Sequence, residues 1–167
     1  MPAEQASRRK CLYDDSSGSI RAAEICMSPC PYCGSEVILI DSALIYNGRG
    51  YGPVWVCSKY PECDAYVGCH KGTTKPLGRL ANRELRTAKM AAHKAFDVLW
   101  QRRAATGRTN RKGARTRGYY WLAEQLKMPR SKCHIGMMDV NDCIRVVKVC
   151  QPYLKGKTNG KPENVTV

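Results

Sequence analysis

The stretches Cys30-Pro31-Tyr32-Cys33-Gly34 and Cys57-Ser58-Lys59-Tyr60-Pro61-Glu62-Cys63 decide the fold. In each stretch two cysteines lie close enough to direct both thiolates at one ion, and Gly34 permits the tight turn after the first pair. The 23 residues between the pairs suit a β-hairpin that returns the chain to the first pair. Four thiolates form a closed tetrahedral shell without a position for substrate or water. We therefore expect one structural Zn2+, held by Cys30, Cys33, Cys57 and Cys63.

Other cysteines and histidines are alternative ligands. Three residues lie near enough to the two pairs to replace one of the four: Cys26, Cys69 and His70. The spacing still favours Cys57 and Cys63 as the second pair. Further candidates occur in the C-terminal half: Cys133, His134, Cys143 and Cys150. Cys143 and Cys150 fall on one apolar face of an expected helix, so burial as small hydrophobic side chains is the preferred interpretation for these cysteines.

The segment between the two cysteine pairs is expected to hold the β structure of the protein. Residues 36–40 and 43–46 are strand-like, Asn47-Gly48-Arg49-Gly50 is a turn sequence, and residues 54–56 form a returning strand. This pattern predicts a zinc ribbon over residues 29–72. The N-terminal segment 1–28 lacks clear periodicity and the tail 155–167 has few apolar residues, so both are expected to be flexible.

Residues 73–154 are predicted to form a basic helical region. Asn82 is a suitable N-cap for a first helix, whose apolar positions follow helical spacing: Leu85, Ala88, Ala92, Ala95, Phe96 and Leu99. The stretch 101–118 carries seven basic residues, no acid, and several Gly and Thr, which predicts a basic loop. A second helix is expected over about residues 114–127, and a third from near Asp139 to Pro152. The fold class is therefore α+β, a small β zinc ribbon followed by about three helices.

Positive charge is concentrated in one segment of the chain. The 28 Lys and Arg exceed the 14 Asp and Glu by +14, and the segment from Lys71 to Gly118 holds +12 of this, with only Glu84 and Asp97 as acids. A local basic patch indicates a polyanionic partner, most often nucleic acid. The residues expected to contact phosphates are Arg83, Arg86, Lys94, Arg102, Arg103, Arg108, Arg111, Lys112, Arg115 and Arg117.

Aromatic residues are interleaved with the ribbon: Tyr46, Tyr51, Trp55, Tyr60 and Tyr66. Exposed rings on such a sheet can stack on the bases of a single strand, whereas buried rings fill a small core. Core filling is the commoner fate of any one ring. The expected partner is nucleic acid, with DNA ahead of RNA.

The sequence also resembles two families. CPYCG followed by VCSKYPECDAYVG, over residues 30–68, is similar to the four-cysteine zinc ribbons at the C-terminal end of type IA topoisomerases. That resemblance implies a ribbon with some DNA contact and no strand-passing activity. A longer resemblance, over roughly residues 30–149, is to small phage and prophage zinc-finger-containing proteins, carried by SALIYNGRGYGPVWVC, YPECDAYVGCHKGTTKPLGRLANRELR and CHIGMMDVNDC. The long basic insert after Trp100 departs from that family. The second resemblance implies a phage or prophage protein in a bacterial cytoplasm.

Two functions stay open, a nucleic-acid-binding module and a regulator that docks on a host protein. An enzyme is not expected, because the sequence holds no paired carboxylates, nucleophile elbow or phosphate-binding Gly loop, and His93 beside Asp97 is typical of a surface contact. The first ten residues contain no apolar run suited to a signal peptide, and residues 37–40, the longest aliphatic stretch, are too few to span a bilayer. We therefore expect a cytoplasmic protein without a membrane partner.

Overall fold

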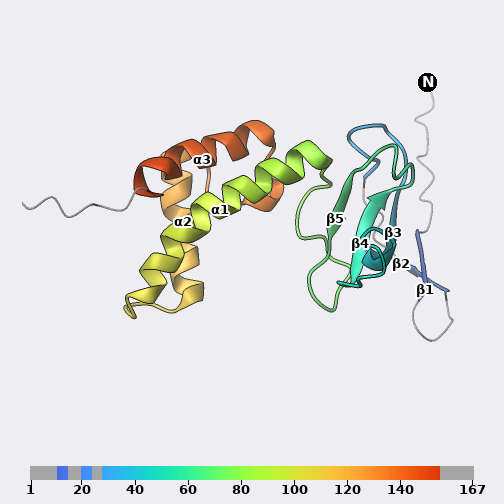
Figure 1. Cartoon of the computed structure of the whole chain (residues 1–167), viewed down its shortest axis with the longest axis horizontal. Coiled ribbons are helices and arrows are strands. Elements are labelled where there is room, and N and C mark those ends of the chain that lie inside the picture. The colour runs from blue at the N-terminus through green and yellow to red at the C-terminus, as the bar shows by residue number, and fades with distance from the viewer. Residues whose placement is uncertain (1–10, 15–19, 24–27, 155–167) are drawn as a thin grey trace, which may run out of the picture. The chain divides into compact units, whose positions relative to one another are not determined.

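The structure is a computed structural model that describes residues 11–14, 20–23 and 28–154. The chain divides into two compact units, Met1–Arg86 and Thr87–Val167, which we call the ribbon unit and the helical unit. In the described residues a three-stranded antiparallel sheet is followed by three α-helices (Figure 1), which confirms the α+β class. None of the helices in this described part is long and apolar enough to cross a membrane.

A short hairpin lies in the N-terminal segment for which the sequence predicts flexibility. Strands β1 (Cys11–Asp14) and β2 (Ile20–Ala23) pair antiparallel, with Cys11 opposite Ala23. Residues 1–10, 15–19, 24–27 and 155–167 lie outside the described residues, so their predicted flexibility stays a prediction.

The sheet of the ribbon unit is built around one hairpin. Strand β3 (Val37–Asp41) pairs antiparallel with β4 (Pro53–Cys57), and β5 (Tyr66–Gly68) pairs with the other edge of β4. The register sets Val37 opposite Cys57. The hairpin therefore returns Cys57 to the start of β3, close behind the first cysteine pair, which confirms the predicted hairpin between the pairs.

The predicted strand over residues 43–46 is wrong. Residues Ser42–Leu44 form a 3-10 helix instead. The chain leaves the sheet there because side chains take over the backbone hydrogen bonds: Asp41 Oδ1 accepts from Ala43 N at 2.7 Å, and the buried Ser42 Oγ accepts from Tyr51 N at 2.7 Å. Such local side-chain bonds compete with the strand ladder.

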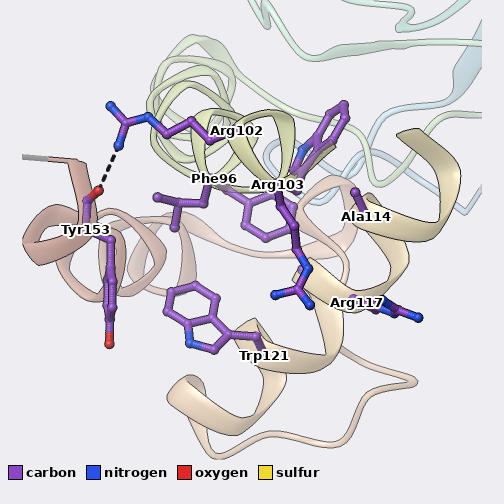
Figure 2. Close-up of a pocket in the computed structure, with 10 residues that line it drawn as sticks. Phe96, Arg102, Arg103, Ala114, Arg117, Trp121 and Tyr153 are labelled. Carbon is purple, nitrogen blue, oxygen red and sulfur yellow. Dashed lines mark hydrogen bonds between the residues drawn. The ribbon is translucent and has the colours of Figure 1, made fainter. Parts of the chain in front are cut away.

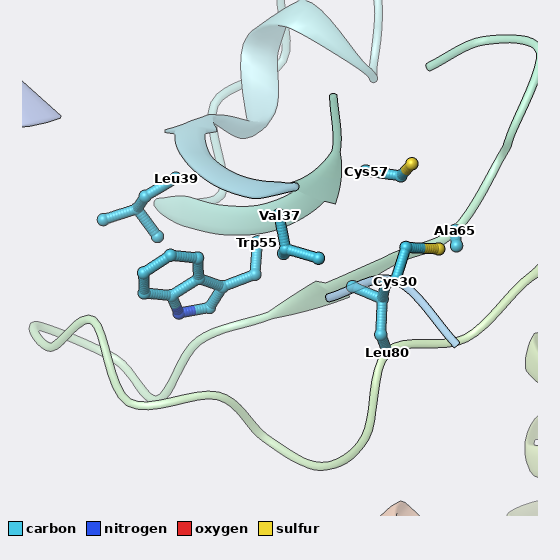
Figure 3. Packing of buried hydrophobic residues seen from close by; sticks show 7 residues of the cluster. All are labelled: Cys30, Val37, Leu39, Trp55, Cys57, Ala65 and Leu80. Carbon is cyan, nitrogen blue, oxygen red and sulfur yellow. The ribbon is translucent and has the colours of Figure 1, made fainter. Parts of the chain in front are cut away.

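The core of the ribbon unit is small and includes two of the cysteines. Its buried residues are Cys30, Val37, Leu39, Trp55, Cys57, Ala65 and Leu80 (Figure 3). Trp55 is fully buried, and its indole Nε1 donates to Thr74 O at 2.7 Å. This bond satisfies the polar atom of the largest side chain in the core and ties the loop after β5 to the sheet.

The first helix, α1 (Arg83–Ala105), begins where the sequence predicts. Asn82 Oδ1 accepts from Leu85 N at 2.9 Å, which confirms the N-cap. The apolar stripe is largely buried, at Leu85, Ala92, Ala95 and Phe96. Leu99 is only half-buried, and Trp100 next to it is buried at 8% exposure.

The predicted basic loop over residues 101–118 is wrong. Helix α1 continues to Ala105 and α2 begins at Arg111 (Arg111–Leu126), so only residues 106–110 link them. The link is short because Asn110 caps α2, its Oδ1 accepting from Gly113 N at 2.7 Å. Ala114 and Tyr119 then pack into the core, with the Tyr119 ring centroid 4.7 Å from that of Phe96. The free energy gained by burying Ala114 and Tyr119 outweighs the weak helix propensity of the Gly and Thr residues in this segment.

The third helix, α3 (Val140–Leu154), completes the helical unit. A 3-10 turn, Ile135–Met137, precedes it. Cys143, Val146 and Cys150 lie on its inner face and are fully buried. The position of this helix agrees with the prediction, and the second helix begins three residues before its predicted start.

Candidate metal centre and basic surface

The two cysteine pairs converge on one point of the ribbon unit. Cys30 and Cys33 precede β3, Cys57 ends β4, and Cys63 lies in the loop before β5. The four sulfur atoms all lie within 4.8 Å of one another, with 3.6 Å between Cys30 and Cys63 and 3.4 Å between Cys33 and Cys57. Four Zn–S bonds of about 2.3 Å in a tetrahedron separate the sulfurs by about 3.8 Å. The cysteines therefore fit one structural zinc ion.

Backbone turns hold each pair in place. In the first pair, Gly34 N donates to Cys30 O at 2.8 Å, and Gly34 adopts a φ of 71°, a region that favours glycine. In the second, Cys63 N donates to Lys59 O at 3.0 Å and Tyr60 N donates to Cys57 O at 2.9 Å. These local turns set the two thiols of each pair close together, and Ser58 N donates to Glu36 O at 2.9 Å, which ties the second turn to the start of β3.

The thiols differ in acidity. Hydrogen bonds from the side chain and backbone of Ser35 lower the pKa of Cys33 to about 6. Burial raises the pKa of Cys57 to about 12 and also raises that of Cys63. Zinc binds thiolates, so loading the site releases protons from the more buried cysteines. With all four positions taken by sulfur, the ion stabilises the fold and offers no open site for chemistry.

The alternative ligands do not join this cluster. Cys69 is half-buried, and its Sγ donates to Thr74 O at 3.4 Å. His70 is exposed on the following turn, and Cys26 lies outside the described residues. Within the described part of the chain, the four cysteines form the only group of three or more potential ligands close enough to share an ion.

The three cysteines of the helical unit are buried as small apolar side chains, as the sequence predicts. Cys133, Cys143 and Cys150 are each fully buried, and burial raises the pKa of all three thiols. His134 is exposed, and its ring lies parallel to that of Tyr119 at 5.7 Å. These residues therefore contribute packing and a stacked ring to the helical unit, and no second metal centre.

The aromatic residues of the ribbon divide between core and surface. Trp55 is core, whereas Tyr46, Tyr51 and Tyr60 are 38%, 73% and 37% exposed. Tyr66 is half-buried and meets the edge of Tyr46 at 6.0 Å. These edge-to-face contacts leave Tyr51 as the most exposed ring of the group.

Two of the predicted phosphate contacts, Arg83 and Arg86, lie in the ribbon unit, and Arg86 forms several contacts there. Arg86 forms an ion pair with Asp64 at 2.8 Å, donates to Asp64 O at 2.6 Å and Ala81 O at 2.7 Å, and covers the Tyr66 ring at 3.9 Å. This guanidinium fastens the first turn of α1 to the chain after the second cysteine pair. Arg83 is exposed on the same turn.

The other predicted phosphate contacts lie in the helical unit. Lys94 is exposed on α1. The rest occupy the last turn of α1, the five-residue link and the first two turns of α2, and all are exposed: Arg102, Arg103, Arg108, Arg111, Lys112, Arg115 and Arg117. We call these seven residues the basic corner. No acidic residue occurs among residues 101–118, so the corner is uniformly positive.

A cleft of about 560 Å³ opens beside the basic corner, and Arg111, Lys112 and Arg115 of α2 line it. We call it the basic cleft; its other lining residues are Trp100, Thr116, Tyr119, Arg130 and His134. Several cations lie over its rings: Arg111 is 5.4 Å from the Trp100 centroid, and Arg115 and Arg130 are 5.8 and 5.2 Å from that of Tyr119.

Two buried polar atoms of residues that line the basic cleft, the Tyr119 hydroxyl oxygen and Arg130 Nε, lack a hydrogen-bond partner among the described residues. Arg130 Nε is buried and has no hydrogen-bond acceptor among the described residues. A buried donor of this kind costs stability unless an acceptor reaches it. Arg130 and His134 enter the cleft from the segment after α2, far along the chain from Arg111, so only the packed structure reveals them.

The position of Trp100 between α1 and α2 is fixed by an acid of the same helix. Asp97 Oδ1 accepts from Trp100 Nε1 at 2.7 Å, while its Oδ2 lies 3.8 Å from His93 Nδ1. The predicted contact of His93 and Asp97 is therefore present. Asp97 thereby holds the Trp100 indole, which lines the cleft, in position.

Comparison with known proteins places the cysteine cluster in a family. Residues 26–153 match the family model DUF3268, described as a zinc-finger-containing domain. No curated protein and no solved structure matches the chain. The match covers both the four-cysteine centre and the three helices, so the zinc ribbon and the helical unit together form the family's domain. The chain belongs to the zinc-finger-containing domain family.

Proposed function

We propose that the protein binds nucleic acid through the basic corner, with phosphates of the strand held in the basic cleft. The observation that carries this proposal is the set of seven exposed basic residues, without an acid, on ordered helix ends and a capped five-residue link. Like charges so close together repel one another and lower the stability of the fold. A polyanion relieves that repulsion.

The basic cleft supplies the local chemistry for this role. Arg111, Lys112 and Arg115 present charged donors, and Arg130 adds a buried donor without an acceptor. Phosphate oxygens accept from such groups in strong, charge-assisted hydrogen bonds. The buried rings of Trp100 and Tyr119 lie beneath the arginines and support their guanidinium groups at the edge of the cleft. The proposed role is binding, without a catalytic step.

The division of the chain supports different roles for its two units. The zinc ion has no open coordination position, so its role is to hold the ribbon unit together. The zinc-binding residues and the basic corner also belong to different units. Loss of the corner's charges should therefore leave the zinc content of the protein unchanged.

The test compares two triple variants of equal charge. In the cleft variant Arg111, Lys112 and Arg115 become Gln, and in the control variant three exposed lysines elsewhere become Gln: Lys71, Lys75 and Lys148. Fluorescence anisotropy measures the affinity for short duplex and single-stranded oligonucleotides at several salt concentrations. If each cleft residue contacts one phosphate, the slope of log affinity against log salt becomes shallower by about 2.7 on a duplex, or about 2.1 on a single strand.

The control variant should keep more of the wild-type slope, because its lysines act only through the general potential. Zinc content and thermal midpoint should match wild type in both variants. Equal slopes of log affinity against log salt for the cleft and control variants would show that the basic corner does not contact the nucleic acid. If wild type binds neither oligonucleotide at low salt, the proposal is wrong. Docking on a host protein, the second function that the sequence leaves open, then becomes the leading one.

A further inference from the structure

A second cavity in the helical unit has a different character from the basic cleft. It has a volume of about 310 Å³ and lies among α1, α2 and α3. Four of its ten lining residues are aromatic, Phe96, Trp100, Trp121 and Tyr153, and three are arginines, Arg102, Arg103 and Arg117 (Figure 2). We call it the aromatic pocket. At the lower end of the usual size range for ligand sites, it suits one small ring system and not a helix.

The walls of the aromatic pocket are fixed by contacts within the helical unit. A Cβ at Gly118 would lie 3.1 Å from Phe96 Cζ, so the glycine lets α2 approach α1 closely. Trp121 meets Tyr153 edge to face at 5.3 Å, and Arg102 donates to Tyr153 O at 3.0 Å (Figure 2). A site formed before its ligand arrives loses less conformational entropy on binding.

The charges at the aromatic pocket are free to meet a ligand. Arg103 of α1 and Arg117 of α2 are exposed, and neither side chain forms a hydrogen bond or ion pair with the described residues. Aromatic walls select a flat apolar body, and two cations select anionic groups attached to that body. A nucleobase joined to its flanking phosphates has this combination of properties.

We propose that the aromatic pocket receives one base turned out of a nucleic-acid strand, while Arg103 and Arg117 contact the phosphates on either side of it. This inference rests on the nucleic-acid binding proposed above. Trp100 lines both the basic cleft and the aromatic pocket, so the two sites are neighbours within the helical unit. A strand whose phosphates occupy the cleft therefore runs close to the pocket.

The experiment uses the wild-type protein with three duplex probes of otherwise identical sequence. One duplex is perfect, one carries a single unpaired bulged base, and one carries an abasic residue at the bulge. An unpaired base costs less to turn out than a paired one, and the abasic probe keeps the phosphates and the distortion while lacking the base. Stacking on aromatic walls should make the bulged probe bind about 5- to 100-fold more tightly than the abasic probe.

Two variants locate that preference. Trp121→Ala removes one wall and should abolish the difference between the bulged and abasic probes while leaving the salt slope unchanged. Arg103→Gln with Arg117→Gln should weaken binding to both probes and flatten the slope. Tryptophan fluorescence adds an independent readout, because the bulged probe should quench the emission of wild type more than the abasic probe does, and Trp121→Ala should reduce that difference.

The outcomes separate this inference from the proposed function. Equal binding of the bulged and abasic probes, with a steep salt slope, would overturn the base pocket and leave nucleic-acid binding intact. Absence of binding to all three probes would overturn both. A short peptide with Glu residues around a Trp serves as competitor. If it quenches Trp121 and binds more tightly than any oligonucleotide, the pocket serves a protein partner and the inference is wrong.

Discussion

The ribbon unit and the helical unit obtain their stability in different ways. In the described part of the ribbon unit, the main cluster of buried residues is small, and two of its members, Cys30 and Cys57, are also metal ligands. The helical unit instead buries large side chains from all of its helices, among them Phe96, Leu122 and Val146. A core as small as that of the ribbon rarely holds a fold without a metal or a disulfide. The comparison indicates that zinc is essential to one unit and dispensable to the other.

Removal of zinc should have the largest effect, because it should unfold the ribbon unit and leave the helical unit folded. Structural zinc contributes about 10–16 kcal/mol in small zinc-finger peptides, so a chelator should unfold the ribbon sheet. The helical unit should keep its helical circular dichroism signal, because its core contains none of the four zinc ligands. Circular dichroism and amide NMR spectra with and without chelator measure this. Complete loss of helix on chelation would contradict the comparison.

Elemental analysis tests the same centre more directly. Wild type should contain about one zinc per chain, because the described residues form one cluster of ligands. Cys63→Ser should lose most of it, whereas Cys69→Ser, a matched control on the same unit, should keep it. A full zinc content in Cys63→Ser would show that another residue completes the shell.

Truncation of Phe96 should have the next largest effect, in the opposite unit. Phe96 is fully buried against Tyr119, and loss of such a ring costs about 3–5 kcal/mol through lost contacts and a cavity. Phe96→Ala should therefore lower the urea midpoint of the helical unit while zinc content stays at the wild-type value. A parallel loss of zinc would mean that the two units do not fold independently.

Leu99→Ala provides a graded comparison on the same helix. Leu99 is half-buried at the edge of the aromatic pocket, so its truncation should cost about 1–2 kcal/mol, less than the full cost of a buried leucine. Urea unfolding of the two variants side by side measures the difference. A larger loss for Leu99→Ala than for Phe96→Ala would place the centre of the helical core at the pocket.

The smallest expected effect concerns the cap of α2. Asn110→Ala removes the acceptor for Gly113 N and should cost about 1 kcal/mol. Because the cap orders the start of the basic corner, the variant should also bind nucleic acid more weakly at unchanged charge. Asn141→Ala, at an exposed position of α3, is the control. Wild-type stability and affinity in Asn110→Ala would show that the corner does not depend on its cap.

The metal centre was predictable from sequence because cysteine spacing is itself a geometric constraint. Two residues between Cys30 and Cys33 determine the turn, and the gap to Cys57 determines the hairpin. The prediction for residues 101–118 was wrong because the structure there depends on packing and not on local spacing. The Gly, Thr and Arg content of this stretch is typical of a loop, but the cap at Asn110 and the burial of Ala114 and Tyr119 produce a helix, and both effects depend on packing.

The basic cleft and the aromatic pocket were outside the reach of sequence patterns. Arg130, His134 and Tyr153 reach these sites through packing with α1 and α2, and no spacing rule links them to Arg111 or Trp121. The exposed cations themselves could be identified from composition. The packed side chains were needed to show which cations face a cleft and which bind other parts of the fold, as Arg86 and Arg102 do.

Arg86 gives the first turn of α1 a built-in response to the state of the zinc site. Its guanidinium binds both the carboxylate and the backbone oxygen of Asp64, the residue directly after Cys63. When the metal leaves and this loop relaxes, Arg86 loses its anchor, and the amides of Leu85 and Arg86 should exchange with solvent faster. Hydrogen–deuterium exchange at these two positions would therefore report metal occupancy from a helix that contributes no ligand.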